Sequence, residues 1–186
     1  MSVPGWGWAR WRAPVGYPLA ALCLWLAHPT VQSVVIGSGI ALLGLLVRAY
    51  AAGHLRKWQA LAVTGPYART RNPLYFGSVL MAVGFAIASR SWLSVAVVVA
   101  YFAAFYPMVM RREAAELRER YGEPYEAYAR SVPLFWPRLR VNGASSASSL
   151  EEGQFSLEQY MQNREYQAAI GFVLLFAAFA AMAMWR

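Results

Sequence analysis

The chain has 186 residues, of which 59% are hydrophobic and only 14% are charged, so it is neither an ordinary soluble domain, which is about a quarter charged, nor a disordered chain. A single cysteine, Cys23, excludes an internal disulfide, and two histidines without any aspartate leave little material for a metal centre or a hydrolytic triad. The net charge is +8, but the arginines punctuate apolar runs instead of forming one stripe, so we expect no nucleic-acid partner.

The first half of the chain contains a long stretch without charge. No Asp, Glu, Lys or Arg occurs between Arg12 and Arg48, and only His28-Pro29 interrupts this stretch. We expect a helical hairpin here, with one helix over about 15–27 and a second over about 31–51.

Two further apolar runs follow, over 72–89 and 91–110, and Ser89-Arg90-Ser91 forms a turn between them. They show no period-two alternation, so they are not strands of a membrane barrel. Their length is close to the roughly 20 apolar residues that a membrane-crossing helix needs. We therefore predict a second helical hairpin, whose second helix ends near Arg111.

The C-terminal part divides differently. Residues 141–155 form a polar, serine-rich linker, and Ser156-Leu157-Glu158-Gln159 offers a capping box. A helix that begins there and runs to Trp185 would be an extra crossing helix. We thus predict a core of four helices over 1–140, the linker, and a C-terminal transmembrane helix over 156–186.

The fold class is therefore all-α: a multi-pass membrane protein with about five transmembrane helices. The positive-inside rule places the N-terminus in the cytosol, because this orientation puts most basic residues inside and only Arg90 and Arg186 outside.

Polar residues gather in two segments, 53–77 and 111–139, which flank the second hairpin and must lie near each other. In the first, Asn72-Pro73 begins a helix. The amides near Leu74, Tyr75 and Phe76 then lie at a helix N-terminus, which suits an anion such as a carboxylate. The alternative is that Asn72-Pro73 is only a cap.

In the second segment Glu113 falls just past the predicted end of its helix, where an ionisable group at the edge of a membrane bundle is a candidate site residue. Tyr125 and Tyr128 share a helical face and are interpreted as packing residues. Arg48 is interpreted as an interfacial side chain that extends toward the membrane surface.

An ordered set of motifs resembles one family, the integral-membrane methyltransferases related to isoprenylcysteine carboxyl methyltransferase and the phospholipid methyltransferases. The set comprises Gly65-Pro66-Tyr67, the run from Arg71 to Gly77, Glu113 with Leu117, Tyr121-Gly122, Tyr125, Tyr128, Val132 and Pro137. It covers roughly residues 53–139.

The resemblance implies S-adenosylmethionine as methyl donor, bound in a cofactor pocket on the cytosolic side, at the ends of these helices. Carried over by position, the cofactor-binding residues are Gln59, Ala60, Leu61, Ala62, Tyr67, Asn72, Pro73, Leu74, Tyr75 and Glu113. From the composition we expect no metal, and we assign no catalytic residue. The ammonium of the donor suits Glu113, its carboxylate suits the amides after Pro73, and its adenosine suits Tyr67.

The chain departs from the family at two places. Many members have histidine where this chain has Asn72. The prenylcysteine enzymes also have a substrate-binding arginine one turn before the glutamate, where this chain has Met108 and Val109. Arg111 and Arg112 lie nearby on other helical faces and are the candidates for substrate binding.

The function implied is methyl transfer inside the membrane to a lipophilic acceptor with a carboxylate, thiol or amine. Two alternatives stay open: an NADPH-dependent membrane reductase, and a non-catalytic membrane protein that docks lipid or a partner through its basic face. The identity and entry route of the acceptor, the role of the C-terminal helix and homo-oligomerisation also stay open.

Overall fold

The computed structural model describes residues 12–56, 60–138 and 155–185 and shows a bundle of helices. In chain order the elements are α1 Arg12–Trp25, α2 Val31–His54, the 3₁₀ helix η2 Gly65–Ala68, α3 Pro73–Ser89, α4 Trp92–Tyr121, α5 Glu123–Ser131, α6 Leu157–Gln162 and α7 Tyr166–Met184. The described part contains no strand, so the all-α prediction is confirmed.

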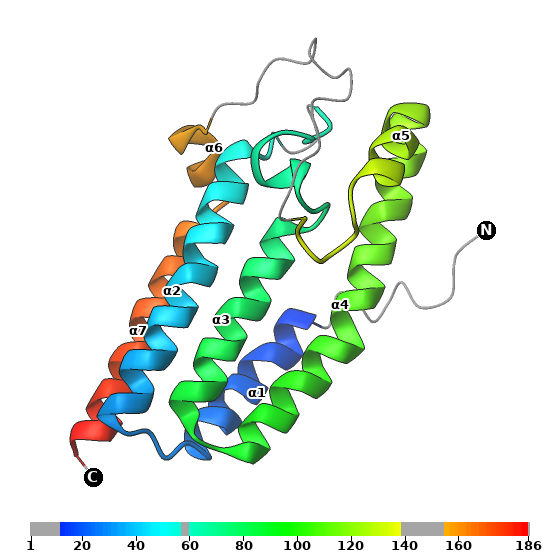
Figure 1. Cartoon of the computed structure of the whole chain (residues 1–186). Helices are drawn as coiled ribbons and strands as arrows, with labels where there is room; N and C mark the ends of the chain where they lie inside the picture. Colours follow the sequence, from blue (N-terminus) through cyan, green and yellow to red (C-terminus); the bar gives the residue numbers. More distant parts are fainter. Residues whose placement is uncertain (1–11, 57–59, 139–154, 186) are drawn as a thin grey trace.

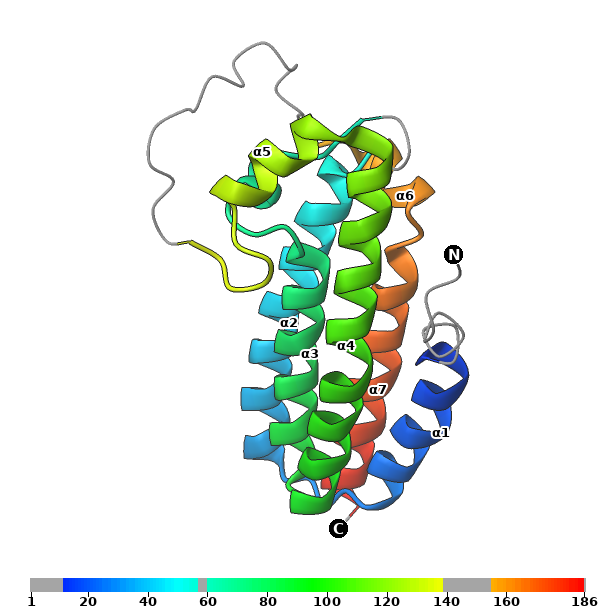
Figure 2. The ribbon, with the colours of Figure 1, turned by 90° about the vertical axis from the view of Figure 1, so that its right-hand side faces the viewer.

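The long helices run side by side, and α5 and α6 lie at the same end of the bundle, on opposite sides of it (Figures 1 and 2). Helices α2 and α4 finish at that end, whereas α3 and α7 begin there. We call it the pocket end. Within the described residues, three helices are long and apolar enough to cross a membrane, namely α2, α4 and α7. Because α3 and the stretch Pro14–Trp25 are shorter, the expectation of about five crossing helices is met in part.

The two predicted hairpin turns are present. Thr30 caps α2 directly after His28-Pro29, through a hydrogen bond that its hydroxyl accepts from the amide of Ser33 at 3.3 Å. Between α3 and α4 the chain reverses at Arg90, whose φ of 50° is left-handed, and the next residue, Ser91, caps α4. Local polar and proline signals therefore set these helix ends, as the sequence predicted.

Helices α2 and α3 pack unusually close, because glycines face each other across the contact. A Cβ atom added to Gly44 would lie 2.5 Å from the carbonyl oxygen of Gly77, and one added to Gly77 would lie 2.6 Å from that of Gly44. Gly37 and Gly84 oppose each other in the same way. Small residues allow helix backbones to approach without a side chain between them. This contact fixes the start of α3 against the last turns of α2.

Helix α4 joins the predicted crossing helix to the helical segment that we expect to end at Tyr121-Gly122, and this corrects the position of Glu113. The helix continues without a break to Tyr121, and Gly122, with a φ of 57°, ends it. Glu113 therefore lies inside α4 and not past its end. Residues after 110 are mostly strong helix formers, and the Arg112–Glu116 ion pair at 2.7 Å supports the turn.

The prediction of one continuous C-terminal helix from Ser156 to Trp185 is wrong, because the structure has two helices there. Ser156 does cap a helix, accepting a hydrogen bond from the amide of Gln159 at 3.4 Å. That helix, α6, ends at Gln162, and α7 begins at Tyr166 after a turn in which Arg164 has a φ of 57°. Helix α7 then packs along α2 (Figure 1).

Candidate functional site

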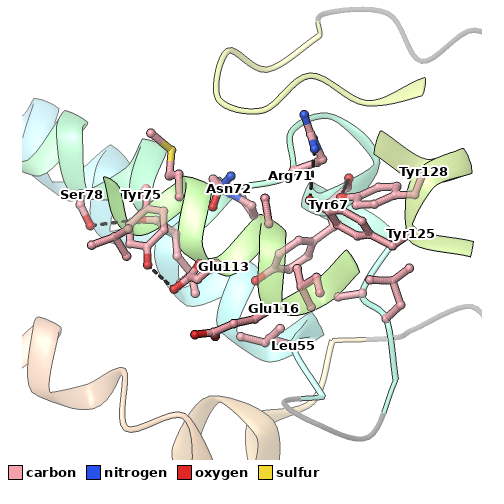
Figure 3. Close-up of a pocket in the computed structure, with 18 of the residues that line it drawn as sticks. Leu55, Tyr67, Arg71, Asn72, Tyr75, Ser78, Glu113, Glu116, Tyr125 and Tyr128 are labelled. Atoms are coloured by element: carbon pink, nitrogen blue, oxygen red, sulfur yellow. Dashed lines mark hydrogen bonds between the residues drawn. The ribbon is translucent and has the colours of Figure 1, made fainter. Parts of the chain in front are cut away.

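A cavity of about 580 Å³ lies at the pocket end, within the size range of ligand sites in proteins. Its walls come from α2, the 60–62 segment, η2, the first turns of α3, the middle of α4, α5 and the start of α7. The residues that line the cavity include Arg48, Ala60, Leu61, Ala62, Tyr67, Arg71, Asn72, Pro73, Leu74, Tyr75, Ser78, Glu113, Tyr125, Tyr128 and Glu165. Figure 3 shows most of these side chains around the cavity.

The start of α3 is held by the segment that follows α5. The amide of Arg71 donates to the carbonyl of Pro133 at 2.9 Å, and the side-chain amide of Asn72 donates to the carbonyl of Leu134 at 2.8 Å. The hydroxyl of Thr70 donates to the carbonyl of Phe135 at 2.9 Å. The two polar segments thus meet, as the sequence predicted. The side chain of Asn72 thus binds the segment after α5 and does not cap α3.

One end of the cavity is aromatic, and we call it the aromatic end: Tyr67, Arg71, Tyr125 and Tyr128. The hydroxyl of Tyr128 donates to the carbonyl of Tyr67 at 2.8 Å, and Arg71 Nη1 donates to the hydroxyl of Tyr125 at 3.2 Å (Figure 3). Tyr67 is 7% exposed and Tyr125 is 1% exposed. Burial raises the pKa of both Tyr67 and Tyr128 well above the usual tyrosine value, so these hydroxyls stay neutral.

One atom at the aromatic end needs a partner. Arg71 Nε is buried and finds no hydrogen-bond acceptor among residues 12–56, 60–138 and 155–185. A buried donor without an acceptor costs about 1–3 kcal/mol. An oxygen or ring nitrogen of a bound ligand would remove this cost.

The middle of the cavity carries a carboxylate. The hydroxyl of Tyr75, on the first turn of α3, donates to the carboxylate of Glu113 on α4 (Figure 3). The ring of Tyr75 also packs edge-on against Tyr106, with centroids 5.2 Å apart. The Glu113 carboxylate is thereby fixed in place toward the cavity, where a cationic group would meet it.

The other end is ionic, and we call it the ionic end: Arg48, Ser78 and Glu165. Arg48 Nε and Nη2 donate to the two carboxylate oxygens of Glu165 at 3.0 and 2.7 Å. Arg48 Nη1 donates to the hydroxyl of Ser78 and to the carbonyl of Leu74, the latter at 3.4 Å. The two charged side chains are 21% and 11% exposed.

Most residues expected to bind a cofactor line this cavity, as the list above shows. Gln59 lies outside the described residues. The amide of Phe76, expected near an anion, donates instead to the carbonyl of Asn72 at 3.0 Å inside the helix. Neither Arg111 nor Arg112 lines the cavity, and Arg112 is paired with Glu116 on its own helix. Their role in substrate binding stays a prediction.

The sequence interpretation missed several cavity residues. Arg48 faces the cavity instead of the membrane surface, and Tyr125 and Tyr128 line the cavity although they were interpreted as packing residues. For Arg48 the sequence did contain a signal, because it is a lone arginine near the end of a long uncharged helix. Nothing in the sequence predicted Glu165, because it comes from a segment more than 100 residues away.

The described residues contain no group of three or more His, Cys, Asp or Glu side chains arranged to hold a metal ion. The cavity offers instead carboxylates, guanidinium groups and aromatic rings. Such a set suits an organic ligand that carries both charges and a flat ring system.

The chain is similar to one known family and to two named proteins. A family model described as "Phospholipid methyltransferase" matches residues 15–124. The nickel-cobalt-cadmium resistance protein NccN of Alcaligenes xylosoxydans xylosoxydans is 32% identical over 154 residues, which cover 78% of this chain and 71% of NccN. The cobalt-zinc-cadmium resistance protein CzcN of Cupriavidus metallidurans is 31% identical, covering 78% and 70%. No solved structure matches the chain.

Proposed function

The chain belongs to the phospholipid methyltransferase family, and from this premise we propose that it transfers a methyl group from S-adenosylmethionine to a lipid-like acceptor in the membrane. Its family and its three long apolar helices make it a membrane protein. The donor would occupy the cavity at the pocket end, and the acceptor would reach it from the bilayer between helices.

The observation that carries the proposal is the carboxylate of Glu113, held by Tyr75 inside a cavity whose far end is aromatic. Glu113 suits the ammonium of the donor, and the amides of Leu74 and Tyr75 in the first turn of α3 suit its carboxylate. Tyr67 offers a flat surface for the adenosine. Arg71 Nε has a buried N–H that a polar atom of the donor would satisfy.

The charges on the donor and on the acceptor explain how such a site would work. When bound, the donor supplies a methyl group on a positively charged sulfur; the carbon–sulfur bond breaks as the carbon bonds to the acceptor, and the electron pair stays on the now neutral sulfur. The chain holds both partners in line and excludes water, and positioning of this kind contributes about 7–11 kcal/mol. A carboxylate acceptor needs no base, whereas an amine must first lose a proton.

The proposed acceptor is lipophilic and ends in a carboxylate, a thiol or an amine. The family supports a membrane lipid or a lipid-like molecule. The absence of an arginine at Met108 and Val109 argues against a prenylcysteine as the natural substrate.

We place the pocket end in the cytosol. Arg56, Arg69, Arg71, Arg118 and Arg120 all belong to segments at that end, whereas Arg90 lies at the turn of the opposite end. An excess of basic residues on one side of the bundle is typical of the cytosolic side.

The first experiment is a ligand titration of the purified wild-type protein. We expect S-adenosylmethionine to raise the melting temperature, since a ligand at 100 times its Kd stabilises the folded state by about 2.7 kcal/mol. We expect NADPH to leave it unchanged. A shift with NADPH alone would indicate a membrane reductase, and a protein that responds to neither ligand would not be an enzyme of this kind.

The second experiment tests Glu113 itself. The Glu113→Gln protein should bind the donor roughly 10-fold more weakly, because the charge opposite the ammonium is lost. The matched control is Glu119→Gln, an exposed carboxylate on the same helix, which should bind like wild type. Incubation with labelled donor and membrane extract should label a lipid-soluble product with wild type and the control. Equal donor binding by all three proteins would place the donor elsewhere.

The names of the two curated relatives supply a physiological setting. By name, one is a nickel-cobalt-cadmium resistance protein and the other a cobalt-zinc-cadmium resistance protein. We extend this setting to the present chain: the methylation serves cells under metal stress. A deletion strain carrying wild type should then tolerate nickel, cobalt, zinc or cadmium salts better than the same strain carrying Glu113→Gln. Equal tolerance would remove the link between methyl transfer and metals.

A further inference from the structure

The C-terminal segment is attached to the end of α2 by direct hydrogen bonds. The side-chain amide of Asn163 donates to the carbonyls of Ala52 and Leu55, each at 2.9 Å, and the amide of Ser156 donates to the carbonyl of Gly53 at 2.9 Å. The last carbonyls of a helix lack partners within the helix and commonly receive them from outside. Helix α6 is thereby seated on α2, as Figure 1 shows.

This attachment brings Glu165 to the cavity. Glu165 is the N-cap residue of α7, yet its side chain makes no capping bond to its own helix. It follows Arg164, whose left-handed φ of 57° is uncommon and strained for a residue other than glycine. The chain holds this backbone conformation at the turn from which the Glu165 carboxylate reaches Arg48.

Arg48 transmits the contact to α3. Two of its nitrogens bind Glu165, and the third binds the carbonyl of Leu74 and the hydroxyl of Ser78. Ser78 also donates to the carbonyl of Leu74 at 3.0 Å. Leu74 belongs to the same helical turn as Tyr75, whose hydroxyl holds Glu113. A continuous set of contacts therefore joins α7 to the centre of the cavity.

From these contacts we propose that Glu165 and Arg48 are positioning residues of the methyl-donor pocket, which makes the C-terminal segment a working part of the site and not only a membrane anchor. The proposal rests on the proposed function. Glu165 lies outside residues 15–124 that match the family model, so the match by itself assigns it no role.

The physical reason is the reach of the arginine side chain. Without Glu165 the guanidinium of Arg48 would be a charge in apolar surroundings without its counterion, and it would extend toward the membrane surface instead. The carbonyl of Leu74 and the hydroxyl of Ser78 would then lose a charged donor, and the first turn of α3 would loosen. The bidentate pair prevents this because it fixes the plane of the guanidinium.

The test compares Glu165→Gln with Glu158→Gln. Glu158 is a carboxylate on α6 that, among the described residues, bonds within its own helix, accepting from Gln162 at 3.0 Å, so its variant is the matched control. We expect Glu165→Gln to weaken binding of S-adenosylmethionine about 10-fold and to lower methyl transfer about 10- to 100-fold. Without any ligand, amide hydrogen exchange over residues 74–78 should also be faster in Glu165→Gln than in wild type or the control.

A second variant separates positioning from simple stabilisation. Replacing a buried ion pair by apolar residues is often neutral or stabilising, so Arg48→Met/Glu165→Leu should melt near the wild-type temperature. It should still bind the donor weakly, because Leu74 and Ser78 have lost their guanidinium. A double variant that regains donor binding together with its stability would overturn the inference.

The two proposals fail in different ways. A wild-type protein that binds no donor would overturn the proposed function. A wild-type protein that binds the donor, together with a Glu165→Gln protein that binds it equally well and shows unchanged hydrogen exchange, would overturn only the role of Glu165.

Discussion

At the aromatic end of the cavity Tyr128 holds Tyr67 through one neutral hydrogen bond, whereas at the ionic end Arg48 and Glu165 meet through two charged ones. A neutral hydrogen bond contributes about 0.5–1.5 kcal/mol net. Removing one partner of a fully buried ion pair costs about 3–5 kcal/mol and an exposed pair contributes less than about 1 kcal/mol, and the Arg48–Glu165 pair, at 21% and 11% exposure, lies between these limits. The ionic end should therefore be the more sensitive of the two to single substitutions, although it lies farther from the family's shared motifs.

Both ends depend on the close contact of α2 and α3, and breaking this contact should have the largest effect. In Gly44→Leu the new side chain would meet the backbone of Gly77 and Met81, which cannot move aside. We expect a loss of at least about 3 kcal/mol in the free energy of unfolding and no donor binding. Thermal melting in detergent measures this.

The control for that prediction is Gly39→Leu on the same helix, where an added Cβ atom would meet nothing within 4 Å. It should melt like wild type. If both variants melted alike, the glycine contact would not be what joins the two ends.

Arg48→Met should have the next largest effect, since it leaves the Glu165 side chain, which is only 11% exposed, without its counterion. We expect the free energy of unfolding to fall by about 3 kcal/mol. Arg130→Met removes an ion pair with Glu123 that is mostly exposed, so it should cost less than about 1 kcal/mol. Chemical unfolding of wild type, Arg48→Met and Arg130→Met measures the two losses in the free energy of unfolding. Equal losses would contradict the expected difference between a partly buried and an exposed ion pair.

Tyr128→Phe should have the smallest effect, and it measures how much the hydrogen bond at the aromatic end contributes to stability. It removes the hydrogen bond to the carbonyl of Tyr67 without removing the ring, so about 1 kcal/mol should be lost. Donor affinity should fall less than in Arg48→Met. Tyr17→Phe, at a tyrosine that is 78% exposed, is the control and should change neither quantity. A larger loss in Tyr128→Phe than in Arg48→Met would reverse the comparison between the two ends.

Much of the site was predictable because family motifs and local signals coincide on it. Tyr67, Tyr75 and Glu113 were identified from short motifs, and the structure brings all three to one cavity. Their pairing was predictable in outline, since the two polar segments flank one helical hairpin. The particular bond from Tyr75 to Glu113 was not, because it depends on how far α4 continues past residue 110.

The sequence by itself determined the helices and most of their ends, because uncharged runs, prolines and capping residues act on neighbouring residues only. Only the tertiary structure decided that α6 and α7 are separate, that Arg48 faces the cavity, and that Glu165 is its partner. These features arise from contacts between segments more than 100 residues apart. The free energy of such a contact depends on burial and geometry, which a local pattern does not contain.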